Sequence, residues 1–266
     1  MINYWCKWAL AIYGWKYLWS WMKFEVGKTL TAFWNSDSSN QDALLEYLDI
    51  SPDDIIKVQW KSDKYHPAYI IAFDHRTKNI VVSIRGTMSV YDLITDANNK
   101  NEKFMDGKVH SGMRRAANNI YRDVVGIMLD KRKDKDYSSY GFRFVGHSLG
   151  AGVASIITHM FLDNYTDHIG KTKTYCFGCP PIFSKNIAEK WENNIVTVVN
   201  NKDVIPRLSI GDQLYLPGLI LHYIKTDSGK TYIGRNKEYF VTESLITTSF
   251  REHMPNKYYE ITQILC

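Results

Sequence analysis

The chain has 266 residues, of which 45% are hydrophobic and 23% charged, and it carries a formal net charge of +5 at pH 7. These values are typical of one large globular domain with a sizeable core, and they exclude a disordered or fibrous protein. The positive charge favours contact with an anionic membrane, but it is too small and too dispersed to indicate nucleic-acid binding.

The N-terminal segment, residues 1–34, is predicted to form an aromatic amphipathic helix that packs on, or extends, a domain spanning residues 35–266. Apolar residues recur in this segment at helical spacing and would share one stripe: Trp5, Trp8, Ile12, Trp15, Trp19 and Met22. Two interpretations stay open. Either the stripe packs on the core of the domain, or its tryptophans contact a membrane interface, where tryptophan is favoured.

Charge and cysteine content bear on the compartment of the protein. Lys7 and Lys16 interrupt the N-terminal apolar segment, and no small-residue cleavage site follows it, so we expect neither a secretory signal nor a membrane-spanning helix. The four cysteines do not have the pattern of a disulfide framework, which favours a reducing compartment. Together these features predict a cytoplasmic protein that is peripheral on a membrane.

Beyond residue 34, strand-like and helix-like segments alternate along the chain. Strands are predicted at residues 55–60, 68–73, 80–84, 142–146, 173–178 and 194–200, and helices at 43–50, 113–130 and 151–162. The segment 74–79 has the composition of a hairpin connection. Strands that alternate with helices predict an α/β fold, with a mainly parallel central sheet and helices on both of its faces.

The sequence Gly-His-Ser-Leu-Gly at 146–150 lies between a predicted strand and a predicted helix. It is either a tight turn or an elbow that presents Ser148 as a nucleophile. The nucleophile is the favoured interpretation, because glycines permit the sharp turn and the free N–H groups of a helix N-terminus stabilise a developing oxyanion. His147 is predicted to be orienting or structural, because adjacent residues on such an elbow point apart.

A serine nucleophile needs a base, and the elbow predicts an acid and then a histidine further along the chain. Asp203 lies just past the last predicted strand, at the carboxyl end of the sheet, and Asp212 and Asp227 are its rivals in turn-like segments. His253 lies in a loop before a predicted terminal helix and is the favoured base. His222 lies in an apolar, strand-like run and is predicted to be a packed residue.

With these residues in place, the chain resembles the class 3 lipases of the α/β-hydrolase fold and, more narrowly, their sn-1-specific diacylglycerol lipase branch. The resemblance runs from about residue 68 to residue 258. It rests on segments in the family's order at residues 80–96, 109–113, 146–152, 176–184, 198–209 and 253–255. Several motifs in the right order are more specific than the elbow alone.

The resemblance implies that Ser148 is the nucleophile, Asp203 the orienting acid and His253 the base of a catalytic triad. It also implies an oxyanion hole formed by Thr87, which follows an Arg-Gly pair, and by the N–H group of Leu149. Thr87 ends a predicted strand and offers both an N–H group and a hydroxyl; the alternative is a plain strand-terminal turn residue.

Two further features follow from the resemblance. Asp92 is expected to support the loop of the oxyanion threonine, and a helix cap is an equally good interpretation. The lid of class 3 lipases should fall between residues 96 and 110, where this sequence is short and polar, with Phe104 and Met105 as its main apolar residues. So weak a lid argues against strong interfacial activation.

No metal or organic cofactor is expected. Cys176 and Cys179 form a single Cys-x-x-Cys pair without the second pair of a zinc site, so we expect buried free thiols. The combined prediction is a serine lipase that hydrolyses an acyl ester of a glycerolipid, with diacylglycerol favoured. The alternatives are a phospholipase A1, another carboxylesterase or an acyltransferase, and a catalytically silent membrane-binding module.

Overall fold

The computed structural model describes residues 1–22, 36–87, 101–200, 203–207, 219–225, 231–235 and 251–263. Within these ranges the central sheet consists of β1 (Ile55–Gln59), β2 (Tyr69–Asp74), β3 (Asn79–Ile84), β6 (Gly141–His147), β7 (Thr172–Phe177), β8 (Ile195–Asn200), β9 (Leu219–Lys225) and β10 (Thr231–Arg235). A separate hairpin consists of β4 (Asn101–Phe104) and β5 (Gly107–His110). The helices are α1 (Ile2–Ala11), α2 (Trp15–Met22), α3 (Ser36–Leu48), α5 (Ser111–Lys131), α6 (Leu149–Asn164), α7 (Lys185–Lys190) and α8 (Pro255–Gln263).

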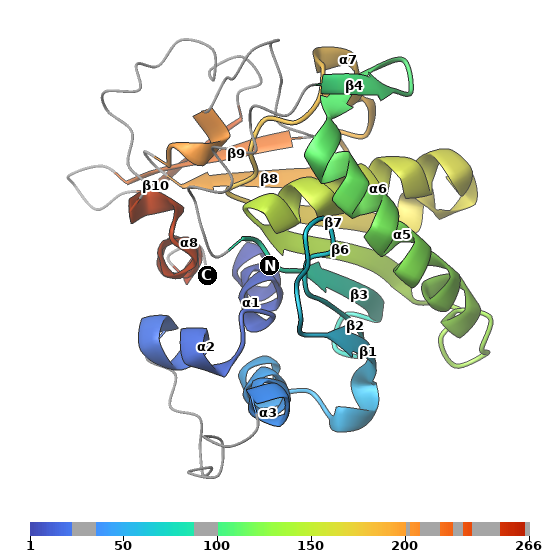
Figure 1. The fold of residues 1–266 in the computed structure, drawn as a ribbon, viewed down its shortest axis with the longest axis vertical. Coiled ribbons are helices and arrows are strands. Elements are labelled where there is room, and N and C mark those ends of the chain that lie inside the picture. The colour runs from blue at the N-terminus through green and yellow to red at the C-terminus, as the bar shows by residue number, and fades with distance from the viewer. Residues whose placement is uncertain are drawn as a thin grey trace.

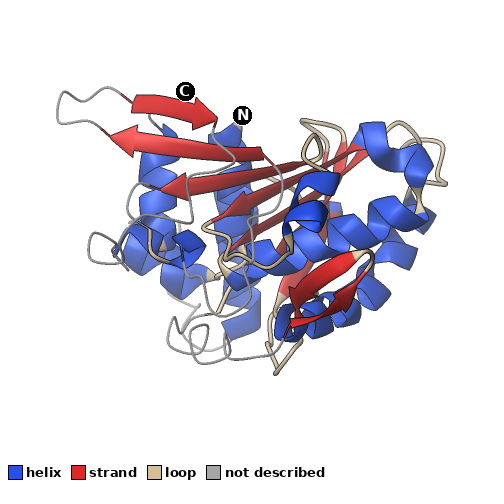
Figure 2. Ribbon diagram, turned by 90° about the horizontal axis from the view of Figure 1, so that it is seen from above, coloured by secondary structure: helices blue, strands red, loops and turns tan. Residues whose placement is uncertain are grey.

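The strand order of the central sheet is β1-β2-β3-β6-β7-β8-β9-β10. From β3 to β9 neighbouring strands are parallel, whereas β1 and β2 at one edge and β10 at the other join in antiparallel pairs. Figure 2 shows the twist that accumulates across these strands. The predicted hairpin at 74–79 connects the antiparallel β2 and β3. This mainly parallel sheet, with helices on both faces, confirms the predicted α/β architecture (Figure 1).

Successive residues of the central strands point into two different cores. Val82 of β3 and Phe144 of β6 pack with the apolar side chains of α5 and α6 on one face. Their neighbours Val81 and Val145 pack with α1, α3 and α8 on the other face (Figure 1). Because these strands are buried on both faces, their sequences form continuous apolar runs, which is why they could be predicted.

The N-terminal segment forms two helices, α1 and α2, where one continuous helix was predicted. The chain breaks at Gly14, which has a φ of 87° and lies so close to Asn40 of α3 that a Cβ atom there would be 2.3 Å from the Asn40 Oδ1 atom. That Oδ1 atom accepts a hydrogen bond from the backbone N–H of Trp15 at 3.0 Å. A contact with α3 therefore separates the first half of the predicted aromatic stripe from the second half.

Burial separates the two interpretations of the stripe. Trp5 and Trp8 are 2% and 1% exposed, so they are core residues, and for these two the core interpretation holds and the membrane interpretation does not. The reason is that α1 is apolar around most of its circumference, and such a helix is buried. On α2, Trp15 is half-buried and Trp19 is 62% exposed. Among the helices of the described ranges, none has the length and apolar character needed to cross a bilayer.

The two predicted lid residues lie at the β4–β5 hairpin. Phe104 is buried, with its ring stacked on Phe183 at a centroid distance of 5.9 Å and close to the ring of His159. Phe104 is therefore a core residue and not a surface lid residue, because its ring completes the apolar cluster under the hairpin. Met105 lies at the hairpin turn, with a φ of 51°. The preceding part of the predicted lid, residues 96–100, lies outside the described residues.

Candidate active site

Ser148 lies at the sharp turn between β6 and α6. Its backbone has φ 58° and ψ −127°, a combination that costs energy for any residue other than glycine and marks a strained elbow. A Cβ atom on Gly146 would lie 2.4 Å from the backbone of Gly150, and a Cβ atom on Gly150 would lie 2.1 Å from the carbonyl oxygen of Ile84. The two glycines are therefore required for the close approach of strand and helix that presents Ser148.

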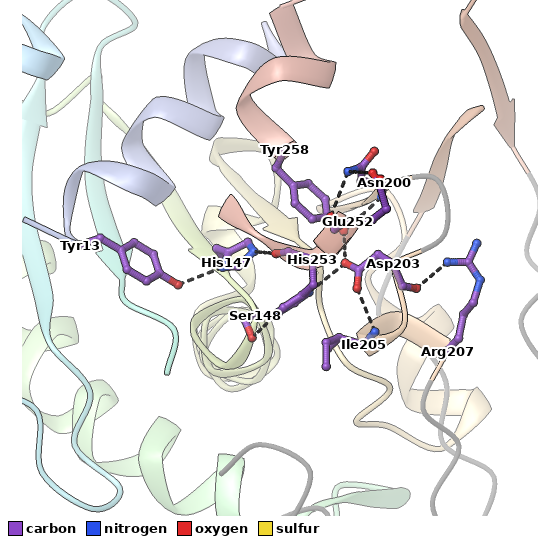
Figure 3. A network of polar contacts seen from close by, with 10 residues as sticks. All are labelled: Tyr13, His147, Ser148, Asn200, Asp203, Ile205, Arg207, Glu252, His253 and Tyr258. Carbon is purple, nitrogen blue, oxygen red and sulfur yellow. Dashed lines mark hydrogen bonds and ion pairs between the residues drawn. The ribbon is translucent and has the colours of Figure 1, made fainter. Parts of the chain in front are cut away.

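Three side chains from distant parts of the sequence meet at this elbow (Figure 3). The His253 Nε2 atom is 2.9 Å from the Ser148 Oγ atom, and the His253 Nδ1 atom is 2.9 Å from the Asp203 Oδ2 atom. Asp203 follows β8, and His253 ends a 3-10 turn just before α8. None of the three side chains is more than 2% exposed. The structure thus brings together the serine, acid and histidine that the sequence predicted as a triad.

The Asp203 carboxylate accepts hydrogen bonds on both oxygens. Its Oδ1 atom accepts from the Ile205 N–H at 2.9 Å, and its Oδ2 atom accepts from the phenol of Tyr258 as well as from His253. These donors stabilise the ionised carboxylate inside the protein. Burial and the charge of Asp203 raise the pKa of Tyr258 well above its ordinary value, so the phenol keeps its proton and remains a donor. The Asn200 N–H donates in turn to the phenol oxygen at 3.1 Å.

His147 points away from Ser148, on the opposite side of the elbow. Its Nε2 atom is 2.9 Å from the backbone oxygen of His253, and its Nδ1 atom is 2.9 Å from the phenol oxygen of Tyr13 (Figure 3). Burial, with the nearby His253 as a second cause, lowers the pKa of His147 well below its ordinary value, so the ring is neutral near pH 7. No sequence motif indicated Tyr13 or Tyr258, because each reaches the site only through the tertiary fold.

The two predicted oxyanion residues flank Ser148. Leu149 is the first residue of α6, and its N–H group is one of those that an α-helix leaves without an intrahelical acceptor. Thr87 is half-buried and follows Gly86, where a Cβ atom would lie 3.1 Å from the Ser148 Cβ atom. The end of β3 therefore lies beside the serine.

The remaining predicted residues lie in β9 or outside the described residues. The backbone of His222 lies in β9. Asp92, Asp212 and Asp227 lie outside the described residues.

Cys176 and Cys179 are buried free thiols, as the sequence predicted. Between them, Gly178 has a φ of 57°, and a Cβ atom there would lie 3.0 Å from the His253 Nδ1 atom and 3.1 Å from the Asp203 Oδ2 atom. This glycine gives the histidine and the carboxylate the room they need. Within the described ranges, no group of three or more His, Cys, Asp or Glu side chains is arranged to hold a metal ion.

Comparison with known proteins points to one family. Residues 81–212 match the family model described as lipase (class 3). The chain is 32% identical over 178 residues to diacylglycerol lipase-beta of Mus musculus, covering 64% of this chain and 26% of that protein. It is 29% identical over 171 residues to diacylglycerol lipase-alpha of Homo sapiens, covering 59% and 16%. The chain thus spans about a quarter of the first relative's length and less of the second's.

Solved structures with a similar fold include lipases as well. The lipase from Rhizopus microsporus var. chinensis has a TM-score of 0.71 and 21% sequence identity, and the match covers 95% of this chain and 84% of that one. At this identity the likeness shows a common fold, the α/β-hydrolase fold. Motif order, fold and family match agree, and residues 81–212 match the class 3 lipase family.

Proposed function

We propose that this chain is a serine lipase that hydrolyses an acyl ester of a glycerolipid, with diacylglycerol as its first candidate substrate. The observation that carries the proposal is the hydrogen-bonded chain from Ser148 through His253 to Asp203, which starts on a strained elbow. The substrate class is supported by the diacylglycerol lipases among its relatives. The chemistry needs no metal or organic cofactor.

In the proposed acylation step, the Ser148 Oγ atom bonds to the ester carbonyl carbon while its proton passes to the His253 Nε2 atom. Asp203 accepts the hydrogen bond from Nδ1–H, which holds the ring in the tautomer that leaves Nε2 free as a base. The imidazolium that forms is stabilised by the buried carboxylate. It then gives its proton to the glycerol oxygen as the carbon–oxygen bond breaks, which leaves the acyl group on Ser148.

Water completes the proposed cycle by the same chemistry. His253 takes a proton from the water as its oxygen attacks the acyl carbon, and the fatty acid leaves as Ser148 regains its proton. In both halves of the reaction the carbonyl oxygen becomes negative beside the N–H groups of Thr87 and Leu149. A donor at this position typically contributes about 3–4 kcal/mol of transition-state stabilisation.

We infer that the enzyme meets its substrate at a membrane and that α2 contributes to this contact. Trp19 is 62% exposed, Lys16 is exposed beside it, and the Lys16 ammonium lies 5.8 Å from the ring centre of Trp15. An exposed tryptophan next to a lysine suits the headgroup region of an anionic bilayer. Trp19→Ser is expected to lower the fraction of protein that sediments with phosphatidylserine vesicles, while Trp19→Phe retains most of it. Equal sedimentation of both variants would contradict this inference.

The proposed activity is tested by fatty-acid release from 1,2-diacylglycerol in mixed micelles, with a phospholipid run in parallel. The wild-type protein is expected to release fatty acid from diacylglycerol, and Ser148→Ala is expected to abolish the release. Release from the phospholipid alone would retain the mechanism and move the substrate to the phospholipase class. No release from either lipid by a folded protein would refute the proposal.

A further inference from the structure

One residue of the N-terminal segment, Tyr13, reaches the active site. Tyr13 lies between α1 and α2, far outside residues 81–212 that match the lipase family model. Its side chain is 8% exposed and points into the site, with its phenol oxygen 2.9 Å from the His147 Nδ1 atom (Figure 3). The two residues are separated by 134 positions in the sequence. This contact therefore joins the N-terminal segment to the residue that precedes Ser148.

The partners of the His147 ring fix the direction of its two hydrogen bonds. The backbone oxygen of His253 can only accept, so the His147 Nε2 atom must carry the proton and donate. The ring is neutral, because burial lowers the pKa of His147. Its Nδ1 atom therefore has a lone pair and no proton, and it must accept from the Tyr13 hydroxyl. The His253 carbonyl oxygen thus requires the Nε2–H tautomer of His147, and the Tyr13 phenol donates to the ring nitrogen that has no proton.

The phenol oxygen of Tyr13 also contacts the end of β3. A Cβ atom on Gly86 would lie 2.5 Å from this oxygen, 2.5 Å from the His147 carbonyl oxygen and 3.1 Å from the Ser148 Cβ atom. The phenol is therefore held between the strand end that leads to Thr87 and the elbow itself.

We propose that Tyr13 is a positioning residue of the active site. Its phenol holds the His147 ring in place by donating to Nδ1, and His147 in turn holds the backbone carbonyl of His253, which places the His253 ring between Ser148 and Asp203. The kinetic part of this inference rests on the proposed function. The N-terminal helical segment thus helps to position the catalytic residues.

The variant Tyr13→Phe keeps the aromatic ring and removes the hydroxyl. His147 Nδ1 then loses its donor, so a buried lone pair is left without a partner and the His147 ring keeps only its hydrogen bond to the carbonyl oxygen of His253. Displacement of a catalytic group by about 1 Å can cost about 100-fold in rate. We expect kcat on diacylglycerol to fall about 10- to 100-fold, with KM changed less than about threefold, since Tyr13 lies behind the catalytic residues and not among the substrate contacts.

Tyr17→Phe is the matched control. Tyr17 is the neighbouring buried tyrosine, its ring lies 5.0 Å from that of Tyr13, and the same single oxygen is removed. We expect Tyr17→Phe to keep wild-type kcat even where it lowers the melting temperature as much as Tyr13→Phe does. Equal loss of kcat in the two variants would overturn the proposal, because the effect would then be one of aromatic packing.

The direct test is the two-bond ¹H–¹⁵N correlation spectrum of the histidine rings, with His147 assigned by the loss of its signals in His147→Gln. The wild type is expected to show His147 as a pure Nε2–H tautomer, and Tyr13→Phe to show the same tautomer with the Nδ1 resonance moved downfield, because Nδ1 no longer accepts a hydrogen bond. A wild-type Nδ1–H tautomer, or an unchanged spectrum in Tyr13→Phe, would overturn the proposal. This readout needs no turnover, so it decides the role of Tyr13 even if the wild type releases no fatty acid and the proposed function fails.

Discussion

The phenol of Tyr258 offers a sharp test of how the buried acid is held. Tyr258→Phe removes one hydroxyl without changing the shape of the ring. Two hydrogen bonds are lost with it: the one donated to the Asp203 Oδ2 atom and the one accepted from the Asn200 N–H. All three groups are buried, so solvent cannot replace the lost partner.

The expected cost follows from the chemistry of the two partners. A hydrogen bond to a charged group contributes about 1.5–3 kcal/mol, and a buried N–H left without an acceptor costs about 1–3 kcal/mol. We therefore expect Tyr258→Phe to lower the free energy of unfolding by about 3 to 5 kcal/mol, a large share of the 5–15 kcal/mol typical of a domain. Activity should fall too, because the carboxylate that orients the His253 ring loses one of the donors that hold it in place. We expect kcat/KM to fall about tenfold, equivalent to about 1.4 kcal/mol.

Urea unfolding followed by tryptophan fluorescence, and kcat/KM at one fixed pH, measure these effects. Tyr259→Phe is the control, because it makes the same change at the next residue of α8, where the half-buried ring faces Tyr47 and not the carboxylate. The control should change the free energy of unfolding by less than about 0.5 kcal/mol and leave kcat/KM unchanged. Equal stabilities of the two variants, or equal values of kcat/KM, would refute this reasoning.

Two further predictions concern the elbow and the acid stability of the fold. Gly150→Ala should prevent formation of the native elbow, because its Cβ atom would lie 2.1 Å from a backbone oxygen. Gly126→Ala on α5 is the control, because a Cβ atom there has open space and should raise the free energy of unfolding by up to about 1 kcal/mol. Thermal melting compares the two variants, and equal stabilities would contradict the reasoning. Burial lowers the pKa of His159 to about 4, while the backbone carbonyl oxygens of Ser155 and Ile187, which face its two ring nitrogens, oppose this shift. Because the pKa in the unfolded chain is about 6.5, stability present above pH 6.5 is lost as the pH falls toward 4, by at most about 3 kcal/mol from this residue. His159→Gln should flatten that loss in urea titrations at pH 7, 5.5 and 4.5, and an unchanged slope would show that another group is responsible.

The features that could be predicted from the sequence are those that depend on residues close together in the chain. The parallel strands could be predicted because burial on both faces leaves long apolar runs, as in β3 and β6. The elbow could be predicted because its glycines follow from backbone geometry at one short segment. The order of Ser148, Asp203 and His253 could be predicted because each follows a sheet strand or precedes a helix in a recognisable way.

Features that depend on distant contacts could not be predicted in the same way. The break between α1 and α2 depends on a contact of Gly14 with Asn40, and Phe104 is buried because Phe183 packs beside it. The strands of the β4–β5 hairpin are only four residues each, too short to establish a period. Tyr13 and Tyr258 reach the site through the fold, and nothing in their neighbouring residues distinguishes them from packed tyrosines.

The most direct test of the central claim is labelling with a fluorophosphonate probe, followed by intact-mass measurement and peptide mapping. The probe phosphonylates a serine only where a base activates it. The wild-type protein is expected to gain one phosphonyl group, on Ser148, while Ser148→Ala gains none and His253→Ala reacts far more slowly. A folded wild-type protein that stays unlabelled, or a label that persists in Ser148→Ala, would contradict the claim that Ser148 is an activated nucleophile.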